Sequence, residues 1–255
     1  MRALSLSSGL LLALLGLVLR LVAPTVGCGD GSYWRHNGLE LRCSASTSQE
    51  PMPVSLLPVG DDGITFTTRA HWMRQANMAL PSLCPFAAFG AVVVNHTTGG
   101  LGDLVCTGAN NNSGSGNPTL HGEMVAISNC SALFVDPRGP YQMTPAEAMS
   151  AFADLTLYTN AESCPMCASA IRWAGFKEYV YGTSIETLVQ KGWGQIHIGS
   201  RYVFEQSSDL PQQTRLVGPV LANETDVFFG WQFDQDALCP WGCSRDRDQG
   251  VCNPA

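Results

Sequence analysis

Residues 155–167 read LTLYTNAESCPMC, an apolar and β-branched run that leads into two cysteines spaced as C-x-x-C. The first five residues predict a buried strand, and Pro165 opens a helix that ends at Gly175. Cys164 then lies at the start of this helix, where unpaired amides and the helix dipole favour a thiolate. Cys167 follows one turn later.

The rest of the chain alternates helices and strands around this unit. The further helices are expected at 67–80, about 118–128, about 144–152 and 185–191, the further strands at 86–95, 104–107 and 178–181, and a last strand or hook near 196–198. The start of the second of these helices is marked by Asn117 as N-cap and Pro118 at the first helical position. This alternation predicts the α/β class, as a three-layer α/β/α sandwich around one mixed five-stranded sheet. The last two strands, joined through a helix, should be parallel.

A second motif, His121-Gly122-Glu123, lies on the helix expected at 118–128. His121, Cys164 and Cys167 together make a three-ligand metal set, and Glu123 is a spare acid. A catalytic zinc typically has three protein ligands and leaves its fourth position to water, whose pKa it lowers toward neutrality. The residues therefore predict one catalytic Zn2+ per chain, with Glu123 as the group that moves protons.

Other interpretations of the C-x-x-C motif stay open. It is also typical of a thiol redox pair, of a plain disulfide, and, with one histidine, of a structural zinc site that needs a fourth protein ligand. The His-x-Glu motif on a helix of its own favours the catalytic site. The remaining histidines lie outside any ligand spacing and are interpreted as ordinary surface or core residues: His36, His71, His96 and His197, the last near the expected pocket rim.

Residues 1–27 predict a secretory signal peptide. Arg2 precedes an almost unbroken apolar run over residues 10–22, and small residues follow up to Gly27. A retained N-terminal anchor is the alternative. We expect a secreted, extracellular protein that begins near Cys28 and has no membrane contact after cleavage. Residues 28–62 then form an irregular extension, 63–205 a zinc domain, and 206–255 a Cys-containing C-terminal extension.

The other cysteines and the sequons suit secretion. Eight cysteines remain outside the C-x-x-C, an even number, and we expect four disulfides that staple the terminal extensions to the core or to themselves. They are Cys28, Cys43, Cys84, Cys106, Cys130, Cys239, Cys243 and Cys252. The last three also suit a second metal site, although no histidine is near. Four sequons predict a glycoprotein, of which Asn111 would crowd the pocket: Asn95, Asn111, Asn129 and Asn223.

The charge of the chain argues against a long nucleic-acid partner. The formal net charge is −7, and loss of residues 1–27 removes two arginines and no acids, which leaves −9. Nucleic-acid binding depends largely on Lys and Arg that neutralise phosphates. A small neutral base or nucleoside is the partner that such a chain attracts more easily.

The two motifs resemble those of the cytidine/deoxycytidylate deaminase superfamily, and most closely its guanine deaminase and tRNA adenosine deaminase branch. Residues 117–123, NPTLHGE, are similar to the D-P-T-x-H-A-E of that branch, and residues 157–174 carry its L-Y-T, E, C-P-M-C, A-I and W-A. The likeness covers about residues 67–205. It departs at Asn117, Gly122 and Ser163, none of which is a ligand or the acid.

The resemblance implies a zinc-dependent hydrolase acting on C–N bonds of cyclic amidines. Such an enzyme converts the exocyclic amine of a nucleobase, nucleoside or nucleotide to a carbonyl and releases ammonia; purines are favoured here. A cytidine or deoxycytidylate deaminase is the alternative within the class. A non-catalytic secreted binding or toxin-like protein with a structural zinc, and a metal-free thiol oxidoreductase, are the alternatives outside it.

The resemblance also implies substrate contacts. Asn110 lies where the family places the asparagine that grips the base, since an amide both donates and accepts; an ordinary polar loop residue is the alternative. Trp193 either stacks on the base or packs in the core, and Gln190 and His197 lie in the region that would close the pocket. Related enzymes are often dimers, so a homodimer is expected.

Overall fold

The computed structural model describes residues 35–36, 39–40, 63–246 and 248–255. The chain divides into two compact units, Met1–Leu56 and Leu57–Ala255. In the first unit, the described residues form an antiparallel pair of short strands, β1 (Arg35–His36) and β2 (Leu39–Glu40). The predicted signal peptide, Cys28, Cys43 and most of the expected N-terminal extension lie outside the described residues.

The second unit is built on the mixed five-stranded sheet that the sequence predicts, in the order β4-β3-β5-β6-β7. β3 (Gly90–Asn95) pairs antiparallel with both β4 (Asp103–Ala109) and β5 (Leu155–Ala161). β5, β6 (Glu178–Thr183) and β7 (Arg215–Val217) run parallel. The three parallel strands therefore have their C-terminal ends on the same side of the sheet. From that side β5 leads directly to Cys164.

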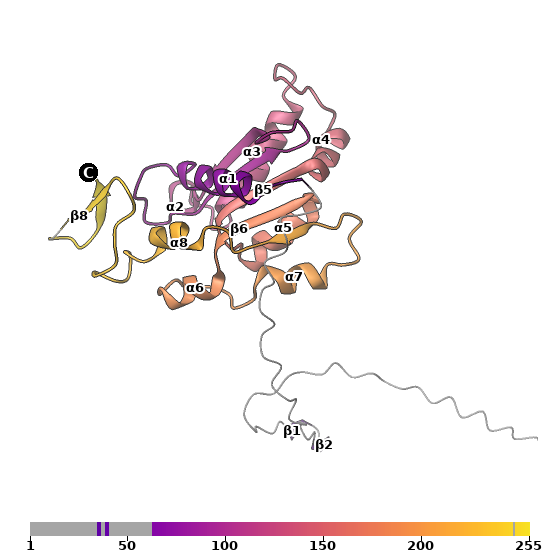
Figure 1. Cartoon of the computed structure of the whole chain (residues 1–255). Coiled ribbons are helices and arrows are strands. Elements are labelled where there is room, and N and C mark those ends of the chain that lie inside the picture. Colours follow the sequence, from indigo (N-terminus) through magenta and orange to yellow (C-terminus); the bar gives the residue numbers. More distant parts are fainter. Residues whose placement is uncertain (1–34, 37–38, 41–62, 247) are drawn as a thin grey trace, which may run out of the picture. The chain divides into compact units, whose positions relative to one another are not determined.

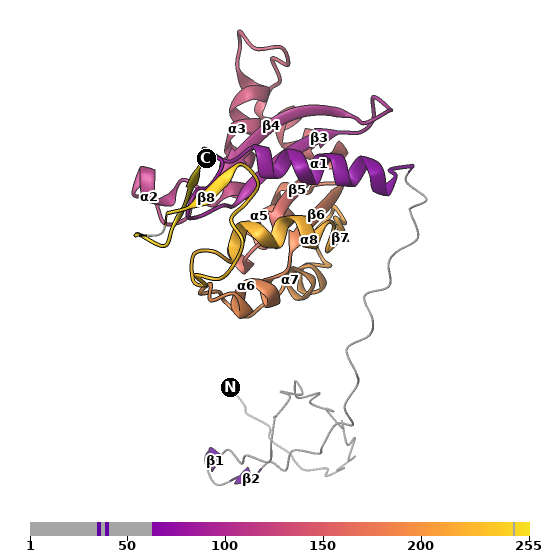
Figure 2. The ribbon, with the colours of Figure 1, turned by 60° about the vertical axis from the view of Figure 1, so that its left-hand side comes forward.

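Helices cover both faces of this sheet and complete the three layers (Figures 1 and 2). Strand alternation assigns the faces: Val92 packs with Met73 of α1 (Phe66–Met78), whereas Val93 belongs to the opposite core, with Phe134 of α3 (Gly122–Val135). The other helices are α2 (Asn112–Ser115), α4 (Pro145–Ala151), α5 (Pro165–Ala174), α6 (Ile185–Gln190), α7 (Ser200–Gln206), α8 (Ala222–Thr225) and the short 3-10 helices Phe152–Asp154 and Asp226–Phe229. None of the described helices is long and apolar enough to cross a membrane.

The predicted start of one helix is wrong. The helix expected to begin at Pro118 begins at Gly122, with His121 as its N-cap. Asn117 does bind a following amide, as a cap would, but the amide is that of Thr119 at 3.0 Å, which makes a turn before the helix. His121 therefore lies at the edge of the helix rather than inside its first turn.

Of the strand or hook expected near residues 196–198, the strand is wrong. Residues 196–198 form no strand, and Ile196 and Ile198 are exposed. The fifth strand is instead β7, which comes after residue 205 and pairs with β6 through Glu178↔Arg215. The sheet thus takes its edge strand from the segment expected to be the C-terminal extension.

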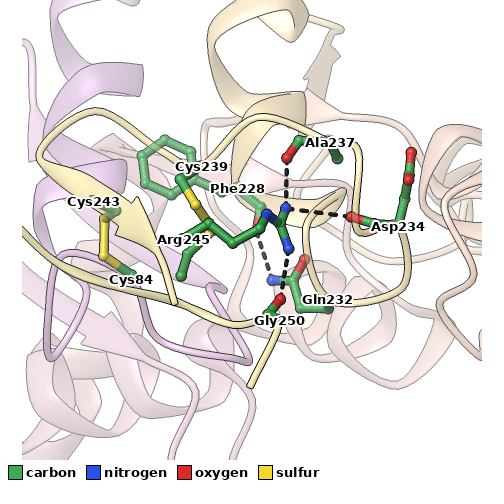
Figure 3. The surroundings of a disulfide bond; sticks show 10 residues. Cys84, Phe228, Gln232, Asp234, Ala237, Cys239, Cys243, Arg245 and Gly250 are labelled. Atoms are coloured by element: carbon green, nitrogen blue, oxygen red, sulfur yellow. Dashed lines mark hydrogen bonds between the residues drawn. A yellow bond between two sulfur atoms is a disulfide. The ribbon is translucent and has the colours of Figure 1, made fainter. Parts of the chain in front are cut away.

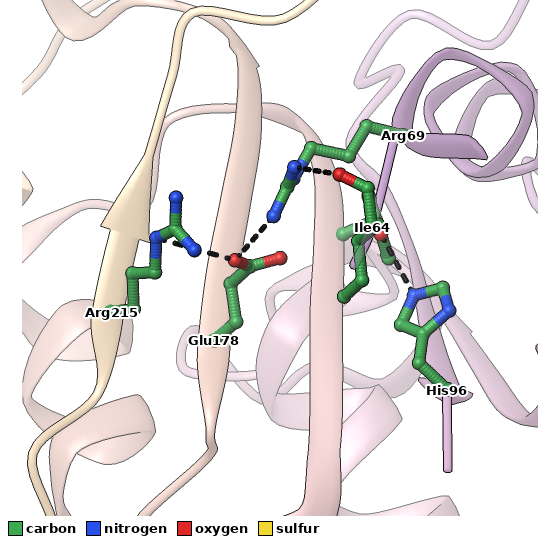
Figure 4. Close-up of polar contacts among 6 residues, drawn as sticks. Ile64, Arg69, His96, Glu178 and Arg215 are labelled. Carbon is green, nitrogen blue, oxygen red and sulfur yellow. Dashed lines mark hydrogen bonds and ion pairs between the residues drawn. The ribbon is translucent and has the colours of Figure 1, made fainter. Parts of the chain in front are cut away.

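A buried ion pair links α1 to the start of β6 (Figure 4). Arg69 Nη2 lies 2.7 Å from Glu178 Oε2, and both side chains are buried. Arg69 also donates to the carbonyl oxygen of Ile64 at 2.7 Å, and Arg215 Nε lies 3.7 Å from the same Glu178 oxygen. Removing one partner of such a pair would leave the other charge buried and unpaired, which is strongly destabilising. We therefore interpret this cluster as one that stabilises the fold.

Three disulfides form among the described cysteines: Cys84–Cys243, Cys106–Cys130 and Cys239–Cys252. The C-terminal hairpin of β8 (Cys243–Arg245) and β9 (Cys252–Pro254) is tied by the first to the segment after α1 and by the third to the chain just before it (Figure 3). Arg245 donates to the carbonyl oxygens of Asp234, Ala237 and Gly250 in the same region. The last three cysteines are therefore disulfide-bonded and do not form a second metal site.

The Cys106–Cys130 bridge joins β4 to α3, the helix that follows His121. Replacing both cysteines by alanine is expected to lower the free energy of unfolding by about 3 kcal/mol, since the bridge closes a loop of moderate length in the unfolded chain. Urea denaturation at saturating zinc measures this change. Ser131→Ala on the same helix is the control, and a loss below about 1 kcal/mol would contradict the prediction.

Candidate metal centre

The three predicted ligands meet where two helices begin. His121 is the N-cap of α3, Cys164 is the N-cap of α5, and Cys167 lies in the first turn of α5. His121 Nδ1 is 3.6 Å from Cys164 Sγ and 3.7 Å from Cys167 Sγ. The three ligand atoms all lie within 4.8 Å of one another. Both helices pack on the same face of the sheet, so the fold brings together ligands from two separate motifs.

This donor set fits zinc. Tetrahedral zinc, with bonds of about 2.3 Å to sulfur and 2.0–2.1 Å to nitrogen, separates a sulfur and a nitrogen ligand by roughly 3.6 Å. The two distances from His121 Nδ1 agree with this separation. Thiolate and imidazole are also the ligand types that zinc prefers. Three protein ligands leave one coordination position for another molecule.

The electrostatics of the two thiols differ. The pKa of Cys164 is lowered to about 4, chiefly because the Cys167 thiol donates a hydrogen bond to it, with His121 adding to the effect. The pKa of Cys167 is raised, because it is the donor in that pair and is buried. The hydrogen bond between His121 and Cys164 raises the pKa of His121. A thiolate therefore forms first at Cys164, the residue at the helix N-terminus.

Glu123 faces the same site from the first turn of α3. Its side chain is only 7% exposed, and burial is the main reason why its pKa is raised. The buried Ser163 hydroxyl has no hydrogen bond of standard geometry, yet it lies close enough to oppose this shift. A shielded carboxyl group with a raised pKa is suited to taking up and returning a proton.

His121, Cys164 and Glu123 line a cavity of about 200 Å³, whereas Cys167 is fully buried and is not part of its lining. Its lining residues are Ala87, Phe89, Asn110, Asn112, His121, Glu123, Glu162, Cys164, Trp193, Gly194 and Gln195. Asn110 and Trp193 thus lie where the sequence places them, whereas Gln190 and His197 are not among the lining residues. A larger cavity of about 500 Å³ lies beside α4 and contains none of the triad, so the chemistry of the residues, not the volume, identifies the site.

The two predicted substrate residues are held firmly. Asn110 donates from its amide nitrogen to Asn112 Oδ1 at 3.0 Å, at the end of β4. Trp193 donates from Nε1 to the Phe229 carbonyl oxygen at 2.9 Å, and its ring packs 5.1 Å from that of Phe89 and 5.2 Å from that of Phe233. Trp193 therefore lines the cavity and also packs against the C-terminal segment, which combines the two alternatives.

Sequence reasoning did not assign a role to two further wall residues, Phe89 and Glu162. Phe89 lies just before β3 and is an ordinary apolar residue in the sequence, so no local signal marks it. Glu162 stands two residues before Cys164 within the family motif, and that position is a signal that could have singled it out. Both contribute to the cavity because of tertiary contacts.

A steric constraint explains why position 122 is a glycine. A Cβ atom at this position would lie 2.8 Å from the Phe89 carbonyl oxygen, closer than a real Cβ approaches. Glycine at this position thus makes room for the chain before β3. The close approach places α3 tightly against the wall of the cavity.

Residues 67–183 match the family described as the cytidine and deoxycytidylate deaminase zinc-binding region. This segment contains the triad, Glu123 and the strands that position them. A His-Cys-Cys triad is characteristic of that family.

Two curated relatives are similar over part of their length. The guanine deaminase of Bacillus subtilis is 35% identical over 106 residues, which cover 41% of this chain and 56% of that protein. A probable cytosine deaminase of Schizosaccharomyces pombe is 29% identical over 145 residues, or 54% of this chain and 75% of that protein. The chain thus matches little more than half the length of the first relative.

A solved structure of a guanine deaminase from Nitrosomonas europaea also aligns with the chain. The TM-score is 0.46 at 15% identity, over 64% of this chain and 81% of that chain.

Proposed function

We propose that the chain is a zinc-dependent hydrolytic deaminase that converts the exocyclic amine of a free purine base to a carbonyl and releases ammonia. The observation that carries this proposal is the burial of Glu123 in the same cavity as a three-ligand zinc triad. A purely structural zinc site has no use for such an acid and would need a fourth protein ligand. Similarity to a guanine deaminase supports the choice of a purine.

The residues of the cavity divide the work. His121, Cys164 and Cys167 would hold the zinc, which lowers the pKa of a coordinated water toward neutrality when bound. Glu123 takes the two protons of the attacking water in turn and gives one to the ring nitrogen and one to the departing amine, while a C–O bond to the water oxygen replaces the C–N bond. Positioned proton transfer of this kind contributes about 10²–10⁴-fold in rate. Asn110 would bind an edge of the base.

The size and charge of the cavity favour a free base over a nucleotide. About 200 Å³ is less than the 300–1,000 Å³ typical of sites for larger ligands. The described residues that line it include Glu123 and Glu162 but neither Lys nor Arg, the residues that bind phosphate. The negative charge of the whole chain acts in the same direction. Phe89 and Trp193 supply apolar faces against which a flat ring can stack.

An ammonia-release screen of the zinc-loaded protein tests the proposal. It should include guanine, adenine, cytosine, their nucleosides and their monophosphates. We expect guanine to have the highest kcat/KM and its monophosphate a value at least about 100-fold lower, since one unpaired buried charge costs several kcal/mol. Preference for a cytosine compound would assign the other branch of the family. No ammonia from any compound would favour a binding protein, and purified protein without metal would favour a thiol oxidoreductase.

We also infer that the protein is secreted, and this rests on the sequence of residues 1–27 together with the disulfides. Bridges such as Cys84–Cys243 persist in oxidising compartments. Expression in a eukaryotic secretory host should deliver to the medium a chain that begins near Cys28, as shown by N-terminal sequencing. Retention of the full chain in the membrane fraction would support the anchor instead. The homodimer stays a prediction from the resemblance.

A further inference from the structure

Part of the cavity wall is a loop without regular structure. Residues 191–199 connect α6 to α7, and Trp193, Gly194 and Gln195 of this loop line the cavity. Apart from the turn at its start, where Trp193 N donates to the Leu188 carbonyl oxygen, the loop is largely exposed. The position of this wall therefore depends on the contacts of Trp193 with Phe229 and Phe233 and on what holds the helices on either side of the loop.

One carboxylate binds the first residue of each of the two helices that flank the loop. Glu162 Oε2 accepts from the backbone amide of Ile185 at 3.0 Å, and Glu162 Oε1 accepts from the backbone amide of Ser200 at 2.7 Å. Glu162 is itself fixed, because its own amide donates to the Thr183 carbonyl oxygen at 2.7 Å. The fully buried Ser200 adds a bond from its hydroxyl to the Ser163 carbonyl oxygen at 3.1 Å. These contacts attach the flanks of the loop to the strand end that precedes the zinc cysteines.

Within the part of the chain that the structure describes, the two amides bound by Glu162 have no other partner. Ile185 and Ser200 are the first residues of α6 and α7, and amides at that position lack a carbonyl within the helix. The N-cap of α7 is Gly199, whose missing side chain leaves the capping to Glu162. A negative charge is also favoured at these helix starts. The carboxylate thus caps α7 in place of a local side chain. At α6 it adds to the cap made by Ser184, whose hydroxyl accepts from the Thr187 amide at 3.1 Å.

We propose that Glu162 is a positioning residue, which helps to fix the Trp193 wall of the base site by anchoring the starts of α6 and α7, the helices on either side of loop 191–199; this rests on the function proposed for the cavity. Glu162 lines the cavity like Glu123, but both of its oxygens already accept from main-chain amides. Its role is therefore to hold the wall rather than to carry protons. The same contacts explain why a carboxylate, with two equivalent acceptors, stands at this position.

The variant Glu162→Gln tests this anchoring with the smallest change in shape. Glutamine has one acceptor oxygen, and its NH2 group would face the second amide without bonding. We expect KM for guanine to rise about tenfold, as the loss of one charged hydrogen bond predicts, with kcat within about threefold and zinc content unchanged. Ser200→Ala, which weakens the same attachment, should raise KM less.

A matched control exists on α4. Glu147 also caps a helix start with its carboxylate, since Glu147 Oε2 accepts from the Thr144 amide at 2.8 Å, but it lies beside the other cavity. Glu147→Gln makes the same chemical change and should leave KM and kcat unchanged. If Glu162→Gln lowers kcat and leaves KM as it was, the positioning role is overturned.

Amide hydrogen exchange, followed by mass spectrometry on the zinc-loaded protein without any base, separates this inference from the proposed function. Peptides that cover 186–199 should exchange at least tenfold faster in Glu162→Gln and at the wild-type rate in Glu147→Gln. Unchanged exchange in Glu162→Gln would refute the anchoring. If the wild type neither binds nor deaminates any base, the proposed function fails, while the exchange rates still decide whether Glu162 holds the loop.

Discussion

Replacing Glu123 by glutamine is expected to lower kcat for guanine by about 10²–10⁴-fold, the range for loss of a positioned acid–base group, and to leave one zinc per chain. Glutamine keeps the shape of the side chain but cannot carry a proton. Glu123 is not one of the three ligand residues, and its 7% exposure leaves little room for bulk water to replace it. Steady-state ammonia release and metal analysis of the same sample measure the two quantities.

Binding of the base separates a chemical defect from a structural one. Because Glu123 would act mainly in the transition state, Glu123→Gln should bind guanine with a Kd within a few-fold of wild type by calorimetry. Glu147→Gln, far from the triad, is the control for the substitution itself. A Glu123→Gln variant with turnover within about tenfold of wild type would rule out the proposed proton carrier.

The elements that the sequence predicted well are those whose local signals agree with the tertiary structure. α5 begins at Pro165 and ends before Gly175, which has a positive φ of 75° as a helix C-cap commonly requires. α4 begins after Thr144, which forms a capping box with Glu147. At these places one conformation satisfies the backbone locally and in the fold.

The start of α3 shows where local signals are ambiguous. An asparagine that accepts from an amide two residues later is equally suited to a helix cap and to an isolated turn. Asn117 makes the turn, and the helix begins only at Gly122. A residue without a side chain is needed there because of the close contact with the Phe89 carbonyl. The result moves His121 to the N-cap position, next to Cys164. This choice depends on packing that no local pattern contains.

The edge strand β7 was not predicted, for a different reason. β7 has three residues, too few for a periodic signal, and it forms because the Arg215 amide reaches the Lys177 carbonyl and Glu178 lies beside it. Residues 196–198 have the better β pattern but are not at the sheet.

The metal ligands and the acid of the candidate site were predictable from the sequence, whereas the full set of residues that line its cavity was not. The ligand types and their spacing identify the triad, because few other functions need two cysteines, a histidine and an acid in two motifs. Glu162 was not assigned a role, since its partners Ile185 and Ser200 lie 23 and 38 residues away and meet it only in the fold. Asn110 and Trp193 line the cavity, and their role in binding a base stays a prediction.

Replacing Cys167 by alanine is expected to abolish stable zinc binding. The side chain is fully buried, and only two protein ligands would remain at the site. Loss of even an outer-shell partner weakens metal affinity about 10–100-fold, so removal of a ligand should exceed 100-fold. After dialysis, zinc should fall below about 0.1 per chain, and ammonia release should be lost with it. Alanine is preferred to serine because it offers no oxygen ligand.

Ser169→Ala is the matched control, since Ser169 lies on the same helix and its hydroxyl donates to the Pro165 carbonyl oxygen at 2.7 Å. It should keep one zinc per chain. A ligand that binds only the folded state raises its stability, so a zinc chelator should lower the melting temperature of the wild type and of Ser169→Ala but not of Cys167→Ala. A redox pair makes the opposite prediction: no metal in the wild type, and a melting temperature that responds to reductant instead of chelator. A Cys167→Ala protein that retained zinc and turnover would show that the buried thiol is not a ligand, and the enzyme assignment would lose its central support.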